Sequence, residues 1–96
     1  MSYLSPLDGP GENKSITVTT TAQEVKIGAN RQIGRAAVAI QPIDDDIYWG
    51  YDSGVTSSTG FKLFKGNLIF LRCTEKLPIY VVAGSGSIDT RIGEIG

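Results

Sequence analysis

The sequence predicts an all-β protein, an antiparallel β-sandwich of about eight short strands that is jelly-roll-like, with a small β-barrel as the alternative. Three observations predict this fold. Apolar and polar residues alternate with a period of two in most segments. Turn residues recur at close to ten-residue spacing, and no segment has a credible helical pattern. A chain of 96 residues also has room for only one domain.

Residues 1–14 are expected to form an extended N-terminal arm, and residues 15–96 the single β-sandwich domain. Proline and glycine interrupt regular pairing in the arm, where only Tyr3, Leu4 and Leu7 could anchor it. Two interpretations stay open. The arm is either a frayed terminus or a segment that docks on a neighbouring subunit through these three side chains.

The domain opens with alternating segments. Ile16 and Val18 alternate with threonine, and Val25 and Ile27 repeat the pattern before a turn at residues 28–30. Together they predict the first strands of the sandwich.

The next strand is expected at residues 35–41, with Ala36, Val38 and Ile40 on one face. The other face carries Ala37 and Ala39, and such small side chains suggest that another surface packs closely on it. An alanine-rich helix is the alternative, but a proline follows at once and no cap precedes the segment.

An aromatic strand follows the turn at residues 42–46. Ile47, Trp49 and Tyr51 share one face, which we expect to build the core. Tyr48 points to the opposite face and is a candidate partner-contact residue, because exposed tyrosine and tryptophan favour interfaces and sugar-stacking surfaces.

The second half of the chain predicts four more strands. They are expected near residues 61–63, 68–73, 78–83 and 88–92, followed by a short tail. The segment 68–73 is apolar on both faces and predicts a central strand that buries Cys73. Asp89 and Arg91 lie outward on the last strand, as a surface ion pair or as charges that protect a sheet edge.

Composition excludes several classes of protein. The formal net charge of −1, from 9 basic and 10 acidic residues, favours neither a nucleic-acid nor a membrane partner. A single cysteine cannot form an internal disulfide. We also expect no signal peptide and no transmembrane helix, since no long apolar run occurs.

The sequence predicts no catalytic, cofactor-binding or metal-binding residues. Without histidine, a Ser-His-Asp triad is impossible. The acidic run 44–46 is better explained as a solvated turn than as a weak calcium site, because adjacent aspartates point in different directions. We therefore expect a binding protein and not an enzyme.

The order of segments resembles the small virion proteins of tailed bacteriophages. The resemblance covers about residues 15–93 and lies in strand order and turn residues. Its parts are an Arg-x-x-Val-x-Ile-Gln strand, an acidic turn with an aromatic-glycine strand, a Gly-Val-Thr-Ser-Ser-Thr-Gly loop, a Phe-x-Leu-x-x-Gly hairpin, an Ile-Tyr-Val-Val-Ala-Gly-Ser-Gly segment and a final Asp-x-Arg-Ile. They lie at residues 35–41, 44–51, 54–60, 61–66, 79–86 and 89–92.

The resemblance implies a non-enzymatic structural part of the particle, such as a head decoration or cement protein, a head fibre or an accessory tail component. A lone module of this size favours decoration. We expect it to bind the major capsid protein or other virion proteins, as a homo-oligomer made in the host cytoplasm and placed on the capsid surface. The alternative is a receptor- or carbohydrate-binding module of a tail or fibre that stacks sugars on its aromatic strand.

Overall fold

A computed structural model describes residues 9–96 of the chain as two packed β-sheets. Its strands are β1 (Gly11–Val18), β2 (Gln23–Glu24), β3 (Ala37–Pro42), β4 (Ile47–Gly50), β5 (Phe61–Leu63), β6 (Ile69–Arg72), β7 (Tyr80–Val82) and β8 (Ile88–Ile95). No helix long and apolar enough to cross a membrane occurs in this part of the chain.

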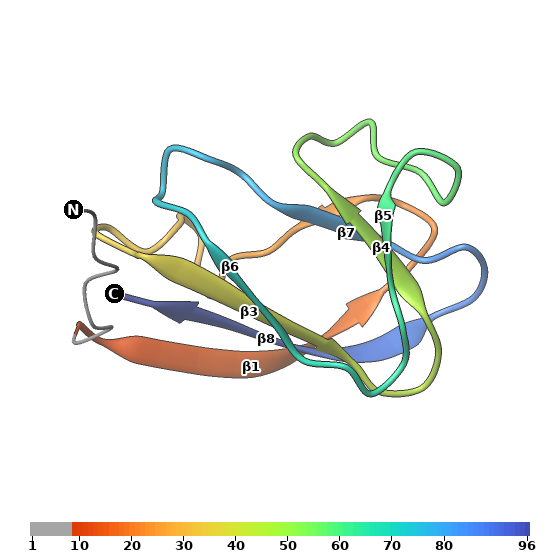
Figure 1. Cartoon of the computed structure of the whole chain (residues 1–96), viewed down its shortest axis with the longest axis horizontal. Helices are drawn as coiled ribbons and strands as arrows, with labels where there is room; N and C mark the ends of the chain where they lie inside the picture. The colour runs from red at the N-terminus through yellow and green to blue at the C-terminus, as the bar shows by residue number, and fades with distance from the viewer. Residues whose placement is uncertain (1–8) are drawn as a thin grey trace, which may run out of the picture.

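The strands form two four-stranded antiparallel sheets, ordered β1-β8-β3-β6 and β2-β7-β4-β5 (Figure 1). We call them sheet A and sheet B. The chain changes sheet after every strand except between β4 and β5, and its first strand lies beside its last, which is the order of a jelly roll. The sheets do not join into a closed barrel, so the sandwich prediction is confirmed.

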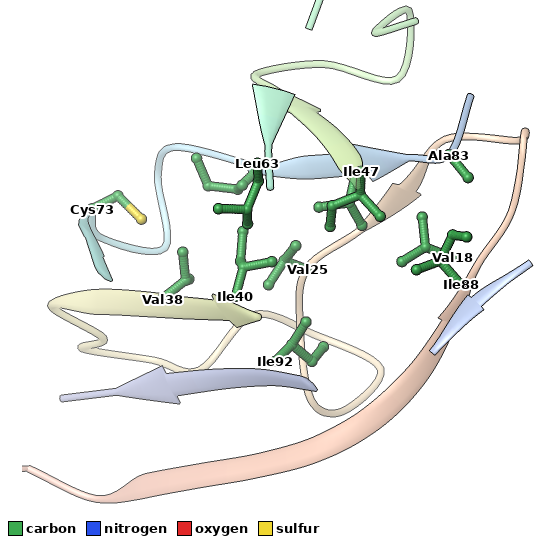
Figure 2. Packing of buried hydrophobic residues seen from close by; sticks show 12 residues of the cluster. Val18, Val25, Val38, Ile40, Ile47, Leu63, Cys73, Ala83, Ile88 and Ile92 are labelled. Carbon is green, nitrogen blue, oxygen red and sulfur yellow. The ribbon is translucent and has the colours of Figure 1, made fainter. Parts of the chain in front are cut away.

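The core lies between the sheets and is built by inward-facing residues of most strands and of the segments that adjoin them. Val38, Ile40 and Ile92 from sheet A face Ile47 and Leu63 from sheet B (Figure 2). Burying each such side chain stabilises the fold by about 1.5–3 kcal/mol. Cys73 joins this cluster as a buried free thiol, as expected. Burial raises the pKa of the thiol, although Arg35 opposes the change.

The prediction of a central strand at residues 68–73 is wrong, because β6 is an edge strand of sheet A. Its two faces are apolar for different reasons. Leu71 faces the sandwich core and packs against it, whereas Leu68 and Phe70 remain 52% and 57% exposed. The apolar residues on the second face of β6 are therefore exposed to solvent and not buried.

Strand β8 is longer and more central than predicted. It runs to Ile95 instead of ending at Ile92, because Gly93 continues the pairing with both β1 and β3. Asp89 and Arg91 form the expected exposed ion pair, with 2.6 Å between Oδ1 and Nη1. They protect no edge, since β8 lies inside the sheet.

Strand β1 begins at Gly11, so residues 11–14 pair with β8 although the sequence assigns them to the arm. The strand predicted around Val25 and Ile27 lies two residues earlier, as β2. Val25 is nevertheless fully buried, and its N–H donates a 2.8 Å hydrogen bond to the carbonyl of Ile79.

A buried ion pair ties the end of β8 to two loops, residues 25–36 and residues 73–79. The Nη1 atom of Arg35 lies 2.7 Å from Oε2 of Glu94, and the two side chains are 0% and 1% exposed. The guanidinium also donates to the carbonyls of Thr74 at 3.2 Å and Leu77 at 2.6 Å. All these groups are far apart in sequence, so the pair fixes the loops that close this end of the sandwich.

Burial tends to raise the pKa of Glu94, but hydrogen bonds to the carboxylate outweigh it and the pKa is lowered. The backbone N–H groups of Ile27 and Gln32 each donate to this carboxylate at 3.0 Å. The charge of Arg35 favours the ionised form further. Glu94 is therefore a carboxylate in the folded protein.

Candidate protein-docking edge

Three aromatic rings meet where β4 lies beside β5. The register pairs Trp49 with Phe61, whose ring centroids lie 4.8 Å apart. The rings of Tyr51 and Trp49 form a T-shaped contact, with centroids 5.5 Å apart and an angle of 89° between the ring planes. Such tilted and edge-to-face contacts are the preferred geometries of aromatic pairs.

The cluster is open to solvent on one side. Trp49 is partly buried and packs against the core, as expected, whereas Tyr51 and Phe61 are 49% and 55% exposed. The prediction that Tyr51 belongs to the core is wrong, because β4 ends at Gly50 and Tyr51 lies in the following bend. Two rings are thus held rigidly by Trp49 while their outer surfaces remain available.

Glycines hold the loop 51–60 against β4. A Cβ atom on Gly50 would lie 2.7 Å from Cγ2 of Val55, and one on Gly60 would lie 2.9 Å from Cβ of Tyr48. Only glycine allows these close approaches. The loop therefore buries Val55 and folds over the outer face of β4.

The aromatic cluster borders a hollow of about 170 Å³ between the two sheets. Trp49 and Tyr51 line one side, residues 70–73 of the β6 edge line another, and Leu77 is 41% exposed at the rim. We call Trp49, Tyr51, Phe61, Phe70 and Leu77 together the aromatic edge. This surface is an open apolar groove beside the outer edge of β6, whose other edge pairs with β3.

Exposed apolar side chains concentrate in the segment from β5 to β6. Of the eight large ones exposed among residues 9–96, four lie between Phe61 and Phe70. These residues span β5, β6 and the segment that carries the chain from one sheet to the other (Figure 1). The edge at β1 is different, because Glu12, Asn13 and Lys14 keep it polar. Grouped exposed aromatics of this kind mark protein-binding surfaces.

Of the residues predicted to contact a partner, only Tyr48 lies in the described part of the chain. It is half-buried on the outer face of sheet B, and Cε1 of its ring lies 3.5 Å from the position of a Cβ on Gly84. It lies on the opposite face of β4 from the aromatic cluster. Tyr3, Leu4 and Leu7 lie outside the described residues.

The acidic run, residues 44–46, lies in the turn between β3 and β4 and accepts hydrogen bonds from other segments. Asp44 accepts a hydrogen bond from the N–H of Asp89 at 3.2 Å, and Asp46 accepts one from the N–H of Lys65 at 2.7 Å. No group of three or more acidic or cysteine side chains placed to hold a metal ion occurs among residues 9–96.

Sequence reasoning found the aromatic strand but missed the site that it belongs to. It does not single out Phe61, Phe70 or Leu77, because the sequence gives no sign that these side chains are exposed. Comparison with known proteins adds no further guide, since no family model, no curated protein and no solved structure matches this chain. The geometry of the aromatic edge therefore carries the functional argument.

Proposed function

We propose that this chain is a non-enzymatic virion structural protein of a tailed bacteriophage, a capsid decoration or cement protein. The aromatic edge is the observation that carries the proposal. In it, Tyr51 and Phe70 line an apolar hollow, and Tyr51 and Phe61 both pack against the ring of Trp49. A preorganised apolar surface of this kind suits a protein partner such as the major capsid protein.

Two further arguments support a place on the capsid. The order of the sequence segments resembles phage virion proteins, as described above. Jelly rolls also build viral capsid and lectin domains, which is an argument from analogy of fold alone. A protein that binds only the assembled head stabilises the head by mass action, so no catalytic step is required.

Cosedimentation with phage heads tests the proposal. Heads from the phage that encodes this chain, purified from a mutant that lacks the protein, are mixed with wild type or with Phe61→Ser. We expect wild type to bind and to raise the temperature at which heads release DNA. Loss of a hot-spot aromatic weakens binding about ten-fold or more.

Ile43→Ser is the matched control, because Ile43 is a partly exposed apolar residue in the turn that precedes β4, away from the aromatic cluster. It should bind heads like wild type. Equal binding by wild type and Phe61→Ser would remove the aromatic edge from the proposal. No binding of wild type to heads would remove the decoration role itself.

A carbohydrate-binding module of a tail or fibre is the second candidate. A hollow of about 330 Å³ lies on the other side of Tyr51 and Phe61, and Asp52 and Thr59 line it with polar groups. Aromatic faces beside hydrogen-bonding side chains are the chemistry that binds sugars. Binding on a glycan array that Asp52→Asn abolishes, without binding to heads, would favour this function over decoration.

A further inference from the structure

A second apolar hollow, of about 380 Å³, lies on the outer face of sheet A. Its floor is made of small residues on the two central strands, Gly93 of β8 and Ala39 of β3, which pair directly. Leu68, Arg91 and Ile95 form its walls. This hollow shares no lining residue with the hollow at the aromatic edge, and it faces away from the core.

The strand register explains the shape of this hollow. One row runs from Asn13 through Gly93 and Ala39 to Phe70 across all four strands of the sheet. The middle of the row has almost no side chain, whereas its end carries the exposed ring of Phe70. A low apolar floor beside exposed Leu68 and Phe70 fits the sequence expectation that another surface packs here.

The N-terminal arm begins beside this hollow. The N–H of Gly9 donates to the carbonyl of Gly96 at 2.8 Å, and the N–H of Gly96 donates to the carbonyl of Pro10 at 2.9 Å. These bonds hold the start of the described chain at the end of the β1–β8 pair, where Gly11 and Ile95 line the hollow. We propose that the hollow binds the chain's own residues 1–8, through Leu4 and Leu7.

The length of the arm fits this site. An extended chain advances about 3.3 Å per residue, so Leu7 and Leu4 can lie about 7 and 16 Å from Gly9. Gly11 and Asn13, which border the hollow, lie two and four residues beyond Gly9 on β1 and therefore about 7 and 13 Å away. A reversal of the chain near Gly9 thus brings both leucines over the hollow.

The chain's own arm has an advantage over the arm of another copy. Its tether is only a few residues long, and short tethers give effective concentrations in the millimolar range. A second copy would need to be present at similar concentration to compete. The proposal is independent of what the aromatic edge binds.

Disulfide trapping distinguishes the two sources of the arm. In a Cys73→Ala background, Leu4→Cys and Ala39→Cys are placed in one chain, or in two chains that are then mixed, and both samples are oxidised. We expect an intrachain disulfide in the double variant and no heterodimer in the mixture. The double variant Leu4→Cys with Lys62→Cys is the control. It should stay reduced, since Lys62 lies on the other sheet.

Heterodimers in the mixture would overturn the proposal in favour of an arm from a second copy. No disulfide in either sample would remove the hollow as the seat of the arm. Because Cys73→Ala could itself destabilise the fold, a second experiment keeps the native Cys73 and measures proteolysis. Chymotrypsin should cut at Tyr3 and Leu4 about ten-fold faster in Ala39→Lys than in wild type, because proteolysis follows the undocked population. Equal rates would contradict docking.

Discussion

Strand β8 supplies the carboxylate of two arginine–carboxylate pairs that are nearly equal in length but opposite in burial. Replacing each carboxylate by its amide measures what burial adds to the stability of such a pair. Glu94 and Arg35 are 2.7 Å apart and buried, whereas Asp89 and Arg91 are 2.6 Å apart and 43–46% exposed. Glu94→Gln leaves the buried guanidinium without its counter-charge. The glutamine side chain also has an NH2 group where the carboxylate has a second oxygen, so one N–H group that donates to Glu94 would face another donor.

We expect Glu94→Gln to lower the free energy of unfolding by about 3–5 kcal/mol, the cost of breaking a buried pair on one side. Asp89→Asn should lower it by about 0–1 kcal/mol, because water screens an exposed pair. Both substitutions remove one negative charge, so a change in net charge cannot explain a difference. The larger loss is a large share of the 5–15 kcal/mol that stabilises a typical domain.

Urea unfolding followed by the fluorescence of Trp49, the only tryptophan, measures both variants. The urea concentration at the midpoint should fall strongly for Glu94→Gln and little for Asp89→Asn. The slope of the free energy of unfolding against urea concentration should stay unchanged. Equal losses in the two variants, or a loss below about 1 kcal/mol for Glu94→Gln, would refute the reasoning from burial.

Three further results follow from the same structure. The folded pKa of Glu94 is lowered, so its contribution is full above its unfolded pKa of about 4.3 and is lost as the pH falls through the folded value; urea midpoints between pH 7 and pH 2.5 should show this loss in wild type and less of it in Glu94→Gln. Ile40→Ala should cost about 2–5 kcal/mol in the same assay, because Ile40 is fully buried between the sheets; a loss under about 1 kcal/mol would mean that the sheets collapse onto the cavity. Phe70→Lys should change stability by less than about 0.5 kcal/mol and lower self-association in light scattering, since it places a charge on the exposed edge strand; unchanged association would show that β6 does not mediate it.

The alternation of apolar residues was enough to predict the sandwich and most of its strands. It placed Val38 and Ile40 on one face of their strand, and in the structure this face lies in the core. It failed at β6, since an apolar residue on the second face of a strand looks the same whether it is buried or exposed to a partner. Only the pairing of the strands shows that Phe70 lies at an edge.

The candidate site was harder to predict for a related reason. Trp49 and Phe61 are brought together by strand register, and Tyr51 is exposed because β4 ends one residue before it. Arg35 and Glu94 lie 59 residues apart, so no local pattern could pair them. Continuing the alternation of β8 past Ile92 would still have shown that Glu94 faces inward, a signal hidden by the glycine between them.

The position of β8 has a consequence for how the chain folds. It is the last strand in sequence, yet it lies between β1 and β3 and supplies the pairing of both. Neither strand can complete its pairing until synthesis has passed Ile95, and the residues of β1 pair with residues at least seventy positions later in the chain. Such non-local pairing slows folding to milliseconds or seconds. Until then the nascent chain presents open strands, and it is in this interval that a chaperone or a neighbouring chain would meet it.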